Sequence, residues 1–240
     1  MENIVMHSAN TRGKADLGWL KANFSFSFGN YQNPERMNFG VLRVINDDII
    51  AAGMGFGTHG HDNMEIITIP LEGALEHKDS IGNGEIIKYG DIQCMSAGTG
   101  IQHSEFNPDK VNPANTLQIW MFPNKQNVTP RYDQLTLDVA KSVNNLQQIL
   151  SPNPDDDGVW VHQNAWFYKG ILDKDLNMKY EINRPENGVY IFVISGKISI
   201  NDNELSTRDG IGLWNITEIN IKVISDKTEI LVMDVPMTIN

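Results

Sequence analysis

Four polar side chains in the first half of the chain have the types and the spacing that suit a metal ion. His59 and His61 are two residues apart, and on a β-strand this spacing places both imidazoles on one face. His103 and Glu105 repeat the same spacing further along. If both segments are extended and adjacent, three imidazoles and one carboxylate converge on one point. Imidazole nitrogen and carboxylate oxygen together suit Fe, Zn, Ni, Cu or Mn.

The pair His59 and His61 is a weak signal when it stands alone. By chance, H-x-H arises in roughly one sequence in seven of this length and histidine content, and two polar loop histidines are then the favoured interpretation. The single cysteine, Cys94, offers no thiolate set for a structural zinc site. Four protein ligands on an octahedral ion would leave positions open for water, substrate or O₂.

Short apolar runs, separated by clusters of Gly, Asn, Asp and Pro, predict the elements that position these residues. Short strands with frequent turns are typical of a sandwich or a closed barrel. No long segment keeps a helical period, and the best helix candidate lies within 135–145. The predicted strands lie at 24–28, 40–47, 66–73, 84–95, 116–122, 159–172, 188–200, 211–215, 219–225 and 229–235.

The length of 240 residues allows one large domain or two of about 120 residues. The segment 123–158 separates two sets of strands and contains prolines and three consecutive aspartates, which favour a linker. The stretches 66–77 and 190–200 resemble each other as strand, glycine turn and strand. We therefore predict two barrels, of which the first carries most of the histidines. A long surface loop inside one domain is the alternative interpretation of the linker segment.

The charge balance and the hydropathy restrict the location and the partners. With 30 acidic and 19 basic side chains, the net charge of −11 argues against binding to nucleic acid or anionic lipid. No apolar run approaches the roughly 20 residues of a membrane span, and the first residues lack a signal-peptide core. The single cysteine suits a reducing compartment. We expect a cytoplasmic protein with no membrane and no direct nucleic-acid partner.

Longer spacing patterns resemble a known family. The spacing of Gly53, His59, His61 and Glu65 resembles the first signature of the cupins. The spacing of Gly90, Gly98 and His103 resembles the second. The whole stretch 58–105 resembles the core of the pirins and of the bacterial pirin-like quercetin dioxygenases. The resemblance is strong over residues 16–135 and weaker beyond. So long a match with fixed spacings is far more specific than H-x-H alone.

The resemblance implies an all-β bicupin fold, with two jelly-roll β-barrels packed together and few short helices. Residues 1–135 would form a metal-binding cupin barrel, and residues 136–240 a degenerate cupin barrel without metal ligands. The implied ligands of one divalent ion are His59, His61, His103 and Glu105. Fe(II) is the ion that the family suggests first, with Cu, Ni, Zn or Mn as alternatives.

The implied activity is a dioxygenase that opens the ring of flavonol-type substrates such as quercetin with O₂ and releases carbon monoxide. Glu105 would accept the proton of the substrate hydroxyl as a general base. A non-enzymatic, metal-containing redox sensor that binds a protein partner is the alternative, because some pirins are associated with regulation. A cupin isomerase acting on sugars or enols is a third and less specific possibility.

Two further residues and an apolar wall complete the predicted site. We expect Glu65 to orient a ligating imidazole rather than to bind the ion itself. We expect His77 to be a hydrogen-bonded strand residue away from the ion. The remaining histidines, His7 and His162, have no partner motif. Residues expected to line an apolar wall beside the ion are Phe56, Met64, Met95 and Phe106.

Overall fold

Strands dominate the structure, a computed structural model that describes residues 3–239. They form two seven-stranded and two four-stranded sheets, paired into two barrels. The first barrel contains β2 (Gly13–Asp16), β3 (Leu20–Phe24), β4 (Leu42–Ile50), β5 (Gly55–His61), β6 (Glu65–Glu72), β7 (Ala74–Asp79), β8 (Gly84–Lys88), β9 (Asp91–Ser96), β10 (Ile101–Phe106), β11 (Ala114–Met121) and β12 (Arg131–Thr136). The second contains β1 (Asn3–His7), β13 (Gln147–Ser151), β14 (Val159–Trp160), β15 (Trp166–Leu172), β16 (Asn177–Glu181), β17 (Asn187–Ser195), β18 (Lys197–Ile200), β19 (Asn203–Ser206), β20 (Gly210–Trp214), β21 (Glu218–Val223) and β22 (Thr228–Pro236). The predicted all-β bicupin fold is confirmed.

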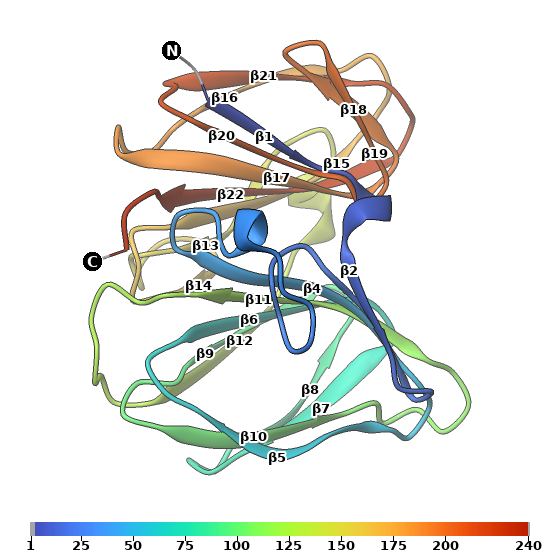
Figure 1. The fold of residues 1–240 in the computed structure, drawn as a ribbon, viewed down its shortest axis with the longest axis vertical. Helices are drawn as coiled ribbons and strands as arrows, with labels where there is room; N and C mark the ends of the chain where they lie inside the picture. Colours follow the sequence, from blue (N-terminus) through green and yellow to red (C-terminus); the bar gives the residue numbers. More distant parts are fainter. Residues whose placement is uncertain (1–2, 240) are drawn as a thin grey trace.

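The two seven-stranded sheets lie at the centre of the molecule and pack against each other (Figure 1). Their orders are β12-β9-β6-β11-β4-β3-β2 and β1-β20-β17-β22-β15-β13-β14. The core between them joins Ile69 and Ile119 of the first barrel to Phe167 and Leu231 of the second. Strands such as β6 and β17 are nearly continuous apolar runs because both of their faces are buried.

The two four-stranded sheets, ordered β5-β10-β7-β8 and β16-β21-β18-β19, form the outer walls (Figure 1). The interior of the second barrel is filled by aliphatic side chains such as Ile198, Ile221 and Val223. Cys94 is a free, buried cysteine of the core between the barrels, and burial raises the pKa of its thiol well above the usual range. At this position Cys94 packs as a small hydrophobic side chain.

The N-terminal strand β1 departs from a division of the chain into barrels at residue 135. Strand β1 pairs with β20 of the second barrel before the chain crosses to the first at β2. At the other end, β12 is the edge strand of the first barrel, and β13 already belongs to the second. The proline-rich segment after Ser151 connects β13 and β14 within the second barrel.

Helical structure is limited, among residues 3–239, to three short 3₁₀ helices at Ala9–Thr11, Pro34–Arg36 and Val139–Ser142. The last of them lies within the helix predicted at 135–145, where only one turn forms. In this described part of the chain, no helix has the length and hydropathy needed to cross a membrane.

Candidate metal centre

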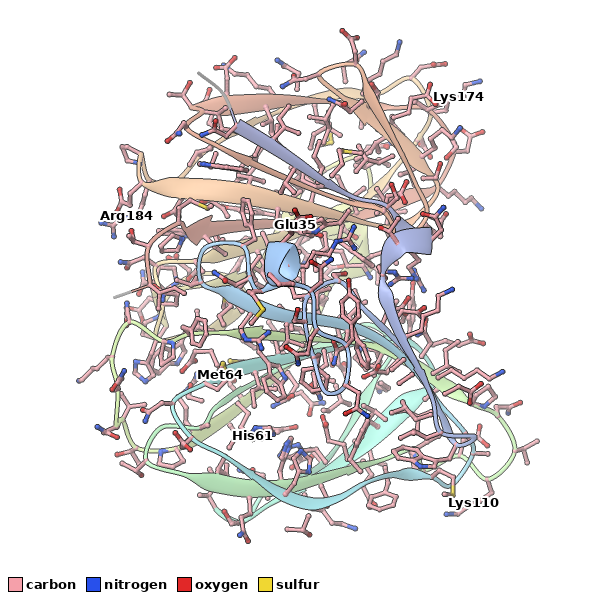
Figure 2. All side chains as sticks on the ribbon, viewed as in Figure 1. Glu35, His61, Met64, Lys110, Lys174 and Arg184 are labelled. Atoms are coloured by element: carbon pink, nitrogen blue, oxygen red, sulfur yellow. The ribbon has the colours of Figure 1, made fainter. Side chains whose placement is uncertain are left out.

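Three of the four predicted ligands come together at one place on the inner face of the first barrel. Strands β5 and β10 pair antiparallel, with His59 directly opposite His103. The ring centroids of His59 and His103 are 4.5 Å apart, and that of His61 lies 4.9 Å from each of them. One donor atom from each ring lies within 4.8 Å of the others. Figure 2 labels His61 inside the lower barrel, above the outer sheet.

A bulge separates this histidine cluster from Glu105. The register of β5 and β10 shifts between His103, which pairs with His59, and Glu105, which pairs with Phe56. Such bulges re-aim side chains beside functional sites. The strands come so close here that a Cβ on Gly55 would lie 2.2 Å from the carbonyl oxygen of Glu105. Glycine is therefore required at this point of β5.

Glu105 lies beside the cluster and is tied to the opposite sheet. The side-chain amide of Gln118 donates to its Oε2 at 2.7 Å, and the Thr68 hydroxyl donates to its Oε1 at 3.4 Å. Trp120 Nε1 donates to Gln118 Oε1 at 3.1 Å, which fixes the amide with its nitrogen toward Glu105. Burial raises the pKa of Glu105. Its carboxyl group is grouped with His103 and His77 within 4.8 Å.

The surroundings of His61 and His103 keep these two imidazoles neutral and available as ligands. Burial, and then the neighbouring His59, lower the pKa of His61 to about 4, and burial with the surrounding histidines lowers that of His103 to about 3. His59 donates from Nδ1 to the Gly57 carbonyl oxygen at 2.8 Å, which leaves Nε2 free. Neither ring nitrogen of buried His103 has a hydrogen-bond partner. This donor set fits a divalent transition-metal ion.

His77 lies closer to the centre than the sequence analysis expected. Its Nε2 contacts Asp79 Oδ2 at 3.2 Å, which agrees with a hydrogen-bonded strand residue. However, β7 pairs with β10 so that His77 stands directly opposite Glu105. Its ring is 5.2 Å from that of His103 and 4.8 Å from that of Tyr132. His77 is thus a buried neighbour of the proposed ligands, because β7 adjoins β10 in the outer sheet.

Glu65 does not contact the imidazole cluster, and the expected orienting role is not seen. Its Oε2 accepts hydrogen bonds from the Ser96 hydroxyl at 2.8 Å and from the backbone N–H of His162 at 3.3 Å. Burial raises the pKa of Glu65 to about 7. Glu65 therefore links β6 to the segment that precedes β15 of the second barrel. The reason is its position at the start of β6 in the inner sheet, away from β5 and β10.

A cavity of about 420 Å³ opens beside the cluster and is lined by His59, His61 and Glu105. Its remaining walls combine aromatic, aliphatic and glycine residues, and its other polar side chains are Asn46, Asp48 and Gln118. The ring of Trp120 meets His61 edge-on, with centroids 4.8 Å apart. The aromatic residues are Trp19, Phe24, Phe28, Phe56 and Trp120. A cavity of this size is typical of sites for small molecules.

Only Phe56 of the four residues expected in the apolar wall lines this cavity. Met64 and Met95 pack in a separate cluster with Ile66. Phe106 points away from the interior because it alternates with Glu105 along β10, and it is 37% exposed. The other aromatic residues that line the cavity, Trp19, Phe24, Phe28 and Trp120, lie outside the two cupin signatures. The alternation of Gln118 and Trp120 along β11 is a sequence signal that could have placed these two side chains on one face.

Two packed barrels with one histidine-rich cluster define a bicupin with a candidate metal centre. Residues 5–121 match the family described as Pirin, and residues 148–235 match the quercetinase C-terminal cupin domain. The chain belongs to the pirin family.

Several relatives cover nearly the whole chain. Quercetin 2,3-dioxygenase of Escherichia coli K12 is 45% identical, over 97% of this chain and 99% of its own length. A pirin-like protein of Caulobacter vibrioides is 35% identical, over 92% of this chain and 94% of its own length. The crystal structure of the bacterial pirin YhhW of Escherichia coli in complex with nickel(II) is 44% identical and superimposes with a TM-score of 0.92, over 98% of this chain and 99% of that chain.

Proposed function

We propose that this protein is a metal-dependent dioxygenase that opens the ring of flavonol-type substrates such as quercetin with O₂ and releases carbon monoxide. The observation that carries the proposal is a cluster of three imidazoles beside a buried carboxyl group at a cavity with several aromatic side chains in its wall. The names of the relatives with 45% identity support the same reaction.

The proposed ligands of one divalent ion are His59, His61, His103 and Glu105. Fe(II) is our first choice, and Cu, Ni, Zn or Mn suit the same donors. The nickel complex of the bacterial relative supports the binding of a divalent ion. When bound, such an ion supplies Lewis acidity, which lowers the pKa of an enol hydroxyl group of the substrate. Both groups of donor residues found among residues 3–239 lie in the first barrel, so we expect one ion per chain.

Glu105 is positioned to hold the proton that the substrate hydroxyl gives up. Its carboxyl group lines the cavity and is kept in place by Gln118 and Thr68. After the proton moves to Glu105, the substrate is an electron-rich enolate that reacts with O₂.

The cavity walls serve to bind and orient a flat substrate. Trp19 and Phe56 meet edge-on at 5.1 Å, and Phe28 meets Trp120 edge-on at 5.4 Å. Such aromatic surfaces favour a planar ring system and exclude water from the reacting atoms. Trp120 contacts His61 directly, so a ring bound against it lies next to the proposed ligands.

The direct test is O₂ uptake by protein loaded anaerobically with each candidate ion, with quercetin as substrate. We expect O₂ consumption with matching release of carbon monoxide, and the highest rate with Fe(II). His162→Ala, which alters a histidine outside the cluster, should retain the activity. Stable metal binding without turnover on quercetin under any of these ions would contradict the proposal and would favour the redox-sensing regulator.

A further inference from the structure

Strand β4 presents three consecutive polar residues to two different sides of the inner sheet. Asn46 and Asp48 share one face and line the cavity beside the candidate metal centre. Asp47 points the other way, where its Oδ2 accepts hydrogen bonds from Arg12 and Arg208, each at 3.1 Å. Asp47 therefore has a structural role in holding the barrels together. The other two residues need a different explanation.

Asn46 and Asp48 are buried without partners. Their exposed fractions are 3% and 4%, and Oδ1 of each side chain lacks a hydrogen-bond partner. Within residues 3–239, no hydrogen bond reaches either side-chain group. Buried polar groups in proteins are nearly always hydrogen-bonded, because an unpaired one has lost its water without compensation. A pair of such groups on a cavity wall indicates a site for a polar ligand.

The position of the pair in the sheet relates it to the reacting end of the cavity. Asn46 stands opposite Gln118 of β11, whose amide donates to Glu105. Asp48 stands opposite Thr116, one step further along the same face of the sheet. The polar pair thus borders the same cavity as three of the proposed metal ligands, His59, His61 and Glu105.

We propose that Asn46 and Asp48 bind hydroxyl groups of the substrate other than the one that reacts, and so select polyhydroxylated aromatic substrates. This inference rests on the proposed dioxygenase function. Burial, and then Asp47 and Glu105, raise the pKa of Asp48 to about 8, so its carboxyl group is mainly protonated at neutral pH and both donates and accepts. Asn46 also offers both a donor and an acceptor. A substrate without these hydroxyl groups leaves both side chains unpaired.

The test compares quercetin with 3-hydroxyflavone, which keeps the reacting hydroxyl and carbonyl groups but lacks the other hydroxyl groups. Binding to metal-loaded protein is measured without O₂ by tryptophan fluorescence, so that it does not depend on turnover. We expect Asp48→Leu and Asn46→Leu to weaken quercetin binding by about ten- to a hundredfold and 3-hydroxyflavone binding by less than about threefold. Asp48→Asn keeps a donor and an acceptor and should restore most of the preference for quercetin.

The matched control is Glu76→Leu, which replaces a carboxylate on β7 that is 39% exposed and pairs with Lys78. This variant should bind both ligands like the original protein. Asp48→Ala repeats the test without added side-chain volume if the leucine variant does not fold. Equal weakening of both ligands, or unchanged quercetin binding, would overturn the assignment. Loss of the binding preference in the Asp48 and Asn46 variants would support the assignment even if no O₂ is consumed. The absence of O₂ consumption would refute only the dioxygenase proposal.

Discussion

The imidazole rings of His77 and His103 lie 5.2 Å apart, and both side chains are buried. His103 belongs to both groups of candidate ligands, whereas His77 belongs only to the group with Glu105. Asp79 Oδ2 contacts Nε2 of His77. Asp79 also stands opposite His103 in the pairing of β7 with β10. The two histidines are close neighbours, but they differ in the groups of candidate ligands to which they belong.

Substitution of these two histidines should affect metal binding to different degrees. We expect His103→Ala to lose the ion, because both groups of donors lose a member. His77→Phe should still bind one ion per chain, with an affinity about 10–100-fold lower, as is typical when a residue that supports the ligands is removed. Elemental analysis and calorimetric titration measure the two effects. If His77→Phe loses the ion as completely as His103→Ala, then His77 is itself a ligand.

Glu105→Gln tests the proposed base. The amide has the same size and can still accept the hydrogen bond from Gln118, so the cavity should keep its shape. We expect kcat to fall by about 10²–10⁴-fold, the usual contribution of a positioned base, if the ion remains bound. O₂ uptake and metal content must be measured on the same preparation. Full activity in this variant would rule out the base role of Glu105.

Removal of the ion should lower the thermal stability. The imidazoles of His61 and His103 are neutral, and the ring nitrogens of His103 have no hydrogen-bond partner. A bound ion would therefore offset the free-energy cost of burying these polar groups. With free ion at 100 times its Kd, chelation should lower Tm by about 5–10 °C for a chain of this size. Differential scanning calorimetry with and without a chelator gives the shift. His103→Ala is the control, and a shift of equal size in that variant would mean that the chelator acts elsewhere.

Much of this architecture is predictable from the sequence because the strand period is two. The spacing of His59 and His61, and of His103 and Glu105, correctly places each pair on one strand, β5 or β10. Spacing alone does not show that β7 is the second neighbour of β10. For this reason His77, which lies on β7, was expected to be away from the centre.

The cavity was harder to predict than the ligand cluster. Its aromatic lining requires the register of β3, β4 and β11, which no motif encodes. The alternating phenylalanines at 24–28 predict a strand there, but β3 ends at Phe24. Phe24 and Phe28 line the cavity, whereas Phe26 packs in the core between the barrels. The N-terminal strand β1 also escaped prediction, because nothing in its sequence indicates pairing with β20 of the other barrel.

The last prediction concerns Glu65, whose carboxyl group is buried where the two barrels meet. Burial raises its pKa in the folded chain from 4.5 to about 7. The folded state therefore holds this proton over a pH range in which the unfolded chain releases it. The contribution of Glu65 to stability is fully present below pH 4.5 and is lost as the pH rises through 7. The loss amounts to about 3 kcal/mol.

Glu65→Gln removes this titration and can still accept hydrogen bonds from Ser96 and from the backbone of His162. We expect the free energy of unfolding of the variant, relative to the original protein, to rise by about 2–3 kcal/mol between pH 5 and pH 8. Urea unfolding at both pH values measures this difference. Glu76→Gln, in which the lost carboxylate is 39% exposed, is the matched control. If Glu65→Gln and the original protein show parallel pH dependences, the Glu65 carboxyl group titrates alike in the folded and unfolded chains, and the prediction is wrong.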